Sequence, residues 1–123
     1  MKLNLGSGDT PKRGYINFDA TIFKRVKTNT ETNVVGRIEA MPFKLESFDQ
    51  IWCSHVIEHF YFKGSLELLR ICYDLLEVDG LCIMEGPCLL GAYEVYVVRD
   101  NNIRKYIQML YGTGPRAVKA YGE

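Results

Sequence analysis

The chain has 123 residues, enough for one domain and little more, and its content of 47% hydrophobic and 24% charged residues is that of an ordinary globular protein. Its 15 basic and 15 acidic residues cancel, so composition gives no electrostatic case for binding nucleic acid or an anionic membrane. No apolar run reaches the roughly 18 residues of a membrane span, and the chain begins directly with a strand pattern instead of a secretory signal peptide. We therefore expect a single domain over residues 1–123, located in the cytoplasm.

Four cysteines are spread through apolar segments and form no Cys-x-x-Cys pair: Cys53, Cys72, Cys82 and Cys88. This pattern favours buried, reduced thiols of a cytoplasmic protein. It does not indicate a structural zinc site, and we expect no bound metal.

The first stretch that carries chemistry lies at the amino terminus. Leu3 and Leu5 predict a short buried strand, and Gly6–Gly8 then permit a tight turn in which the backbone can approach a ligand. A second apolar run, Tyr15–Phe18, ends at Asp19. Because ligands of open α/β sheets bind at the carboxyl ends of strands, a carboxylate there can accept hydrogen bonds from a ribose diol. The first twenty residues therefore resemble half of a nucleoside-binding site.

The spacing of this stretch argues against ordinary dinucleotide binding. The third glycine of the dinucleotide fingerprint is missing, and Asp19 follows Gly8 sooner than the roughly twenty residues of that motif. A full crossover helix hardly fits between the two runs. This is a difficulty for a parallel sheet, since parallel neighbours usually need a dozen or more connecting residues.

The middle of the chain predicts one further short strand and one central strand. Residues 20–33 are polar and favour a loop or a poor helix, and Val34–Val35 is a candidate short strand. Pro42 forbids a continuous helix over residues 36–43. Phe48–Ser54 is nearly continuous in apolar, β-prone residues, as expected for a strand that is buried on both faces.

The clearest predicted helix covers Gly64–Asp79, with Ser65 as its N-cap and Gly80 as its stop. A strand over Leu81–Glu85 follows, and the order strand, helix, strand implies a parallel, right-handed crossover. The helix carries one apolar stripe at helical spacing, made of Leu68, Leu69, Cys72, Leu75 and Leu76.

The pattern weakens toward the carboxyl terminus. Tyr93–Val98 is ambiguous between helix and strand. Asp100 or Asn101 could cap a helix, which the segment Tyr111–Pro115 would then break. The face of that helix would be formed by Ile103, Tyr106, Ile107 and Leu110.

Taken together, the pieces resemble the small class I methyltransferases that depend on S-adenosylmethionine (SAM). Leu3–Gly8 resembles the glycine-rich first motif, and Gly14–Asp19 resembles the second strand with its ribose-binding acid and an abbreviated connection. Met41–Phe43 followed by Ser47–Ile51 is similar to the Leu-Pro-Phe and Ser-Phe-Asp segments of the family. Ser54–His59 is similar to a characteristic turn after the fourth strand. The resemblance covers roughly residues 2–90.

This resemblance implies an α/β fold, a three-layer Rossmann-like arrangement on a mostly parallel sheet that lacks the usual last two strands. It implies SAM as cofactor and transfer of its methyl group, by in-line displacement, to an acceptor that the sequence does not identify. The missing strands would leave a sheet edge open, and an open edge invites pairing, so we expect either a homodimer through that edge or a naturally short protein with impaired function.

The resemblance also assigns roles to individual residues. His55 is the candidate catalytic base, because an imidazole can accept a proton near neutral pH. Backbone near the glycines would meet the amino-acid end of SAM, the acid would hold the ribose, a later loop would flank the adenine, and the turn would line the reaction centre. In that order the cofactor-binding candidates are Leu5, Gly6, Ser7 and Gly8; Asp19; Ile38, Glu39 and Met41; Ser54 and His55.

Two departures from the family pattern leave a second function open. Arg37 stands where the family usually has an acid that meets the adenine amino group, and Glu39 is the candidate substitute. The second departure is the absence of the last two strands, whereas the replacement of the usual Pro-Gly-Gly by Val78–Gly80 should cost little. The alternative is therefore a degenerate, non-catalytic module that holds SAM or acts through a partner.

A third, remote possibility comes from the segment His55–His59, which also fits the His-x-x-Glu-His pattern of zinc peptidases. If the segment were helical, His55 and His59 would share a face and could hold zinc, with Glu58 as the base.

Overall fold

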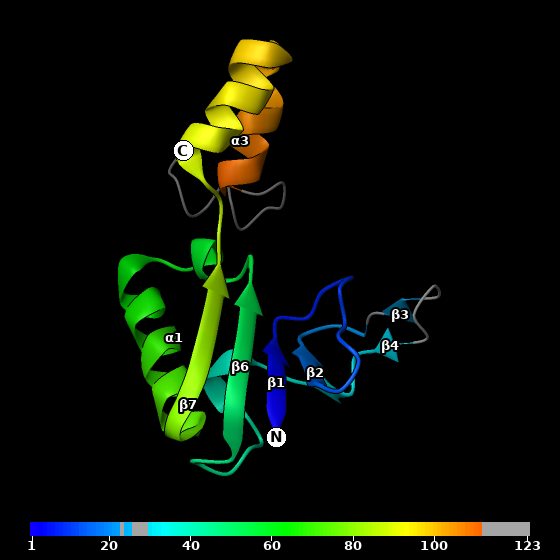
Figure 1. The fold of residues 1–123 in the computed structure, drawn as a ribbon, viewed down its shortest axis with the longest axis vertical. Coiled ribbons are helices and arrows are strands. Elements are labelled where there is room, and N and C mark those ends of the chain that lie inside the picture. Colours follow the sequence, from blue (N-terminus) through cyan, green and yellow to red (C-terminus); the bar gives the residue numbers. More distant parts are fainter. Residues whose placement is uncertain (23, 26–29, 112–123) are drawn as a thin grey trace.

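The computed structural model describes residues 1–22, 24–25 and 30–111. Five strands form one sheet in which every neighbouring pair is parallel, in the order β5–β2–β1–β6–β7 (Figure 1). The α/β class and the mostly parallel Rossmann-like sheet are therefore confirmed. The strands are β1 (Lys2–Leu5), β2 (Ile16–Asp19), β5 (Val34–Val35), β6 (Phe48–Ser54) and β7 (Leu76–Glu85).

The order of the strands places a switch point between β1 and β6. The chain moves outward from β1 through β2 to β5, and then returns to the other side of β1 for β6 and β7. Because all five strands are parallel, their carboxyl ends meet at one end of the sheet. Ligands of doubly wound folds bind at such a switch point, so this end is where a site is expected.

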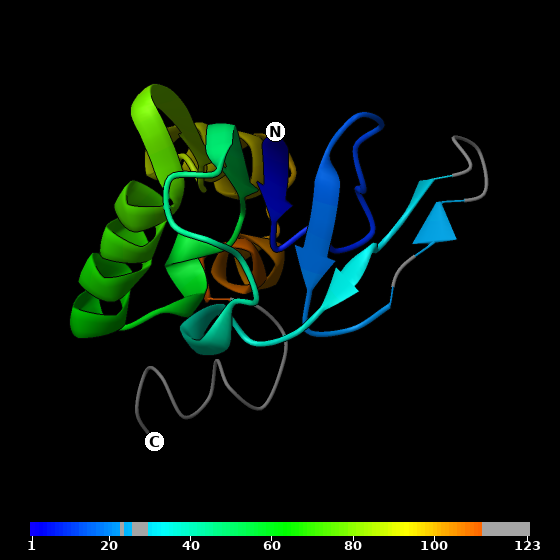
Figure 2. The ribbon, with the colours of Figure 1, turned by 90° about the horizontal axis from the view of Figure 1, so that it is seen from below.

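Helix α1 (Phe62–Leu75) packs on one face of the sheet (Figure 2). Its buried residues join a core that includes Leu3, Leu5, Phe18 and Ile51 from three strands. The 3₁₀ helix η1 (Ile38–Ala40) lies on the same face, and Phe43 contacts the rings of Phe18 and Phe48 edge to face, at 5.8 and 5.2 Å between centroids. The buried side chains that α1 contributes are Leu68, Cys72 and Leu75.

The predicted ends of this helix are wrong. The helix begins at Phe62 with Tyr61 as its N-cap residue, and the Ser65 hydroxyl instead donates to the Tyr61 carbonyl at 3.1 Å. It ends at Leu75, because Leu76 already pairs with Phe48 in the sheet. The predicted strand Leu81–Glu85 is confirmed and extends back to Leu76, across an irregularity in the ladder that contains Gly80.

A buried amide network explains how β1 and β2 can be parallel neighbours with so short a connection. The Asn4 side chain donates to Asn17 Oδ1 at 2.9 Å and to the Thr10 carbonyl at 3.2 Å. Asn17 Oδ1 also accepts the Lys12 N–H at 2.7 Å, while its amide donates to the Lys12 carbonyl at 3.1 Å. Asn33 Oδ1 accepts the Asn17 N–H at 2.8 Å. On this face of the sheet, residues 6–15 take the place of a crossover helix.

The segment predicted as a loop or poor helix, residues 20–33, is different where it is described. Lys24–Arg25 (β3) and Thr30–Glu31 (β4) form a small antiparallel ladder. Residues 23 and 26–29 of that prediction lie outside the described part of the chain. The strand at Val34–Val35 is confirmed and extends the main sheet as β5.

A helical hairpin follows β7 and stands beyond the carboxyl ends of the strands (Figure 1). Helix α2 (Leu89–Ala92) continues as the π-helix η3 (Tyr93–Arg99), which settles the ambiguous segment, and α3 (Ile103–Tyr111) returns alongside. The cap of α3 is Asn102, whose Oδ1 accepts the Lys105 N–H at 3.0 Å, and not Asp100 or Asn101. The predicted break at residues 112–115 lies outside the described residues.

Within the described ranges no strand follows β7, which is an edge of the main sheet as expected. No described helix is both long and apolar enough to cross a membrane.

The cysteines follow the prediction in part. Cys53 and Cys72 are buried, Cys82 is half-buried, and Cys88 is exposed, which corrects the expectation of four buried thiols. Burial raises the pKa of Cys53 to about 12 and keeps that thiol neutral. A hydrogen bond to Cys82, together with burial, raises the pKa of Cys72 as well.

Candidate functional site

The glycine loop after β1 has the geometry that glycine permits. Gly6 and Gly8 have φ angles of 67° and 49°, in the left-handed region that other residues rarely adopt. A Cβ on Gly6 would also collide with Cγ2 of Val56, which lies in the turn after β6. A Cβ on Gly8 would meet no atom within 4 Å. Gly6 is therefore fixed by packing, whereas Gly8 faces open space that a ligand could use.

The structure brings the glycine loop and the predicted ribose-binding acid together. The Gly8 N–H donates to Asp19 Oδ2 at 2.8 Å, and the Thr21 N–H donates to Asp19 Oδ1 at 3.2 Å. Each carboxylate oxygen has a further lone pair, so Asp19 can still accept from hydroxyl groups. Its backbone carbonyl accepts the Gly36 N–H at 3.0 Å, which ties the loop before η1 to the same place.

The hydroxyl of Ser7 is a buried polar group of the glycine loop whose hydrogen bonding is incomplete. Its side chain is 1% exposed, its N–H donates to the Phe18 carbonyl at 3.0 Å, and its Oγ has no hydrogen-bond partner among the described residues. A buried hydroxyl without a partner is costly and is commonly completed by water or a ligand. With the free space at Gly8 and the lone pairs of Asp19, this loop fits a ligand with hydroxyl and amino-acid groups.

The predicted adenine-flanking residues surround η1. Ile38 and Met41 are half-buried and pack against the core, so that the loop has an apolar inner side. Glu39 is exposed, and its Oε2 lies 3.6 Å from Nε of Arg37. Arg37, which stands at the position of the family's usual acid, therefore pairs with Glu39, the candidate substitute for that acid. The ligand roles of these side chains stay predictions.

The turn after β6 holds His55 in a strained and oriented position. His55 has a φ angle of 55°, and its N–H donates to the Glu85 carbonyl at 2.9 Å. Strain of this kind in a non-glycine residue is often found at functional sites. Nδ1 of His55 lies 3.0 Å from Oε1 of Glu58, whose side chain is only 12% exposed. With Nδ1 engaged, Nε2 is the nitrogen left for a ligand.

The zinc-peptidase interpretation of this segment is wrong. Its pattern needs a continuous helix that places His55 and His59 on one face. The structure instead has His55 in a left-handed conformation and a 3₁₀ helix, η2, that covers only Ile57–His59. In the described part of the chain, no group of three or more His, Cys, Asp or Glu side chains could hold a metal ion.

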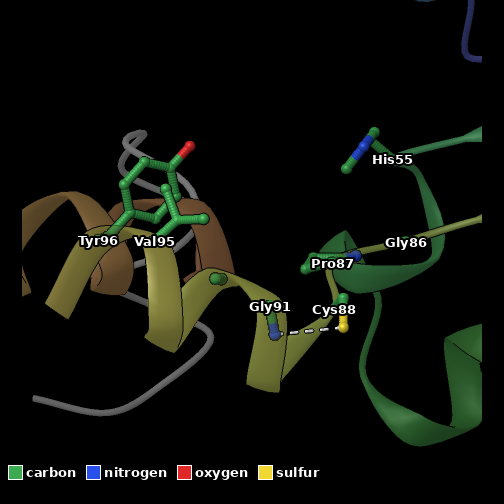
Figure 3. A pocket seen from close by; sticks show the side chains of 8 residues that line it. His55, Gly86, Pro87, Cys88, Gly91, Val95 and Tyr96 are labelled. Carbon is green, nitrogen blue, oxygen red and sulfur yellow. Dashed lines mark hydrogen bonds between the residues drawn. The ribbon is translucent and has the colours of Figure 1, made fainter. Parts of the chain in front are cut away.

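A cavity of about 250 Å³ opens beside His55, between the carboxyl ends of the sheet and the helical hairpin (Figure 3). His55 reaches toward it from the turn after β6, and the π-helix contributes the opposite wall. The lining carries no Asp, Glu, Lys or Arg. It consists of His55, Gly86, Pro87, Cys88, Gly91, Ala92, Val95 and Tyr96.

Sequence reasoning missed the hairpin side of this cavity. Cys88 Sγ accepts the Gly91 N–H at 3.4 Å and caps α2, while Val95 and Tyr96 come from the segment whose pattern was ambiguous. A second hollow, of about 260 Å³, lies near Ser54 on the face opposite α1. There Lys12 Nζ lies 3.8 Å from the centroid of the Trp52 ring.

Comparison with known proteins adds one match. The family model described as "Methyltransferase domain" matches residues 15–84, more than half of the chain. The matched range contains Asp19, η1 and the turn with His55, and it begins after the glycine loop. No curated protein matches the chain.

Proposed function

Because this chain belongs to the methyltransferase domain family, we propose that it transfers a methyl group from SAM to a small, uncharged acceptor. The observation that carries the proposal is the 2.8 Å hydrogen bond between Gly8 N–H and Asp19 Oδ2. That bond places a glycine turn with open space next to a carboxylate, at the switch point of a parallel sheet. This is the combination that an adenosine derivative with an amino-acid tail requires.

Different residues of the site would bind different parts of the cofactor. The backbone from Leu5 to Gly8 would bind its amino-acid end, and the buried Ser7 hydroxyl would gain the partner that it lacks among described residues. Asp19 would accept hydrogen bonds from the ribose hydroxyls. Ile38 and Met41 would offer apolar surface to the adenine ring. When bound, SAM supplies a methyl group already activated by its positively charged sulfur.

The remaining task of the protein is to position the acceptor. Ser54 and His55 stand at the carboxyl end of β6, and the cavity beside His55 would hold the acceptor in line with the methyl group. Its lining contains no Asp, Glu, Lys or Arg, which favours an uncharged acceptor. Glu58 holds Nδ1, so Nε2 of His55 would accept the proton that a hydroxyl or amine acceptor loses.

The test is transfer of labelled methyl from SAM across a panel of small phenols, alcohols and amines, with charged analogues of each. We expect turnover for an uncharged member of the panel and little for its charged analogue. His55→Asn should lower kcat by about 100-fold, because general base catalysis typically contributes about that much or more. His59→Asn, an exposed histidine on the same turn, is the matched control and should retain activity. Equal rates for His55→Asn and the wild type would reduce His55 to packing.

One observation favours a second candidate, a SAM-binding module without turnover. Arg37 occupies the position of the usual acid and is paired with Glu39 in an exposed ion pair, with side chains 82% and 59% exposed. SAM affinity that is unaffected by any acceptor, with no labelled product, would support this module.

A further inference from the structure

Helix α1 carries a second apolar stripe that faces away from the core. Phe62 is 79% exposed, Leu66 52%, Leu69 44% and Tyr73 77%. Their spacing of four, three and four residues is that of one continuous seam along the helix, as in a coiled coil. The core side of the same helix is a separate set of buried residues, Leu68, Cys72 and Leu75.

No described element covers this seam. Helix α1 lies at the margin of the described molecule in both views, with the sheet on its other side (Figures 1 and 2). Scattered exposed apolar residues need no explanation, but a contiguous row of two leucines and two aromatic rings marks an interaction surface. Aromatic and leucine side chains in such a row are the residues that protein interfaces bury at their centre.

The charges beside the seam indicate which partner fits. Lys63, Glu67, Arg70 and Asp74 follow one flank of the seam and alternate in sign along the helix. When the order of these four charges is reversed, every position receives the opposite sign. In a two-fold symmetric antiparallel pair the same flanks of the two helices face each other, so a second copy of α1 presents complementary charges there; in a parallel pair these flanks lie on opposite sides of the contact, and the charges do not meet. Arg70 Nε and Asp74 Oδ2 are 3.7 Å apart within the helix, which keeps both groups on that flank.

We propose that the protein forms a two-fold symmetric homodimer in which the α1 seams of two copies pack antiparallel. The symmetry brings Phe62 of each copy against Tyr73 of the other, and Leu66 against Leu69. On the flank, Lys63 approaches Asp74 of the second copy, and Glu67 approaches Arg70. Such an interface is isologous and closes at two copies, as expected for the commonest class of oligomer.

The open sheet edge is a poorer surface for self-association than the seam. Strand β7 carries Glu77, Asp79 and Glu85 and no basic side chain. Antiparallel pairing of two such edges would bring carboxylates of the same sign together across the new ladder, which destabilises strand pairing. The dimer expected from the sequence is thus reassigned by this proposal from the edge to α1. It makes no use of the cofactor loop and goes beyond the proposed function.

The experiment is the oligomeric state of the full chain in solution, from light scattering and sedimentation over a range of micromolar concentrations. We expect a reversible monomer–dimer equilibrium. Leu66→Lys should raise the dimer dissociation constant by about 100-fold, because the two-fold symmetry brings one introduced charge from each copy to the centre of the interface. Val78→Lys is the matched control, since Val78 is 84% exposed on the β7 edge and should leave the equilibrium unchanged.

Charge reversal separates the seam from a general loss of solubility. Glu67→Arg should weaken the dimer, and the double substitution Glu67→Arg with Arg70→Glu should restore it, because the second change returns opposite charges to the facing positions. Far-UV circular dichroism on each variant checks that α1 is intact. A wild-type monomer throughout the range would overturn the proposal. So would a dimer that Val78→Lys disrupts and Leu66→Lys does not, or a double variant no tighter than Glu67→Arg alone.

Discussion

Two connections between parallel strands of this sheet are held in place by different interactions. Between β1 and β2, residues 6–15 are held by hydrogen bonds from buried asparagine side chains, Asn4 and Asn17. Between β6 and β7, helix α1 is held by apolar packing of residues such as Leu68 and Cys72 against the strands. The first connection contains the glycine loop, and the second contains only one end of the site, the turn at His55.

The difference shows why the ligand-facing geometry lies at the polar connection. An apolar crossover fills the space above its strands with side chains, as α1 does. The β1–β2 connection is instead held by hydrogen bonds from the asparagine side chains of the strands beneath it. Its outer side is left free of packed side chains, so that Gly8 faces open space beside Asp19. Substitutions in the polar connection should therefore lower ligand affinity as well as stability, whereas substitutions in the apolar connection should lower stability alone. Four substitutions separate these effects.

Gly6→Ala should have the largest effect, a loss of about 4 kcal/mol in the free energy of unfolding. About 1–2 kcal/mol comes from a Cβ in a left-handed conformation, and about 1–3 kcal/mol from displacing Val56. Urea unfolding measures the loss. Val56→Ala in the same chain should recover part of it, and strictly additive losses would contradict the contact between the two positions.

Leu68→Ala should lower the free energy of unfolding by about 3 kcal/mol, because the side chain is 1% exposed and its loss leaves a cavity under α1. Affinity for SAM, measured where the variant is still folded, should not change. Leu89→Ala is the control: this leucine is 62% exposed and its loss should cost less than about 0.5 kcal/mol. A large loss of SAM affinity in Leu68→Ala would contradict the separation of the two connections.

Asn17→Ala should lower stability by about 2 kcal/mol, since the Lys12 N–H and the Asn4 amide lose their acceptor. In contrast to Leu68→Ala, it should also weaken SAM binding by about tenfold, because the loop that presents Gly8 is no longer pinned. Calorimetry with SAM and urea unfolding measure the two effects. Asn33→Ala removes a single acceptor oxygen and should have a smaller effect on both stability and SAM affinity. A variant of Asn17 with normal affinity would mean that the loop holds its shape without the network.

Asp79→Gly should have the smallest effect, a gain of about 0.5 kcal/mol. Asp79 has a φ angle of 64°, which glycine adopts without strain. Thermal unfolding measures the gain. Gly80→Ala is the contrasting variant, because a Cβ there would lie 2.9 Å from the Glu77 carbonyl oxygen, and it should be destabilised. A loss of stability in Asp79→Gly would show that the aspartate side chain supports the turn.

Much of the sheet was predictable because its signals are local. The alternation of Leu3 and Leu5 with polar neighbours, and the apolar run Phe48–Ser54, each specify a strand without reference to the rest of the fold. The ends of α1 were not predictable in this way. Gly80 reads as a helix stop, but pairing of Leu76 with Phe48 ends the helix earlier. Tertiary pairing overrides a local signal there.

The candidate site was likewise predictable only where its signals are local. The proximity of Gly8 and Asp19 followed from the motif and the carboxyl-end rule. Asn4 and Asn17 carry a signal that could have been found, since each is the polar residue inside an apolar strand and lies on the face away from α1. The cavity wall at Val95 and Tyr96 could not be found, because it depends on how a hairpin docks beside His55, which no spacing encodes.

Calorimetric titration of the purified chain with SAM and with S-adenosylhomocysteine tests directly whether the glycine loop and Asp19 bind the cofactor. Wild type and Asp19→Ala are compared, with Asp49→Ala as the control, because Asp49 pairs with the amino terminus at an exposed position away from the loop. We predict micromolar binding of both ligands, at least about tenfold weaker in Asp19→Ala and unchanged in Asp49→Ala. No binding by the folded wild type, or equal binding by Asp19→Ala, would contradict the assignment of the glycine loop and Asp19 as the cofactor site.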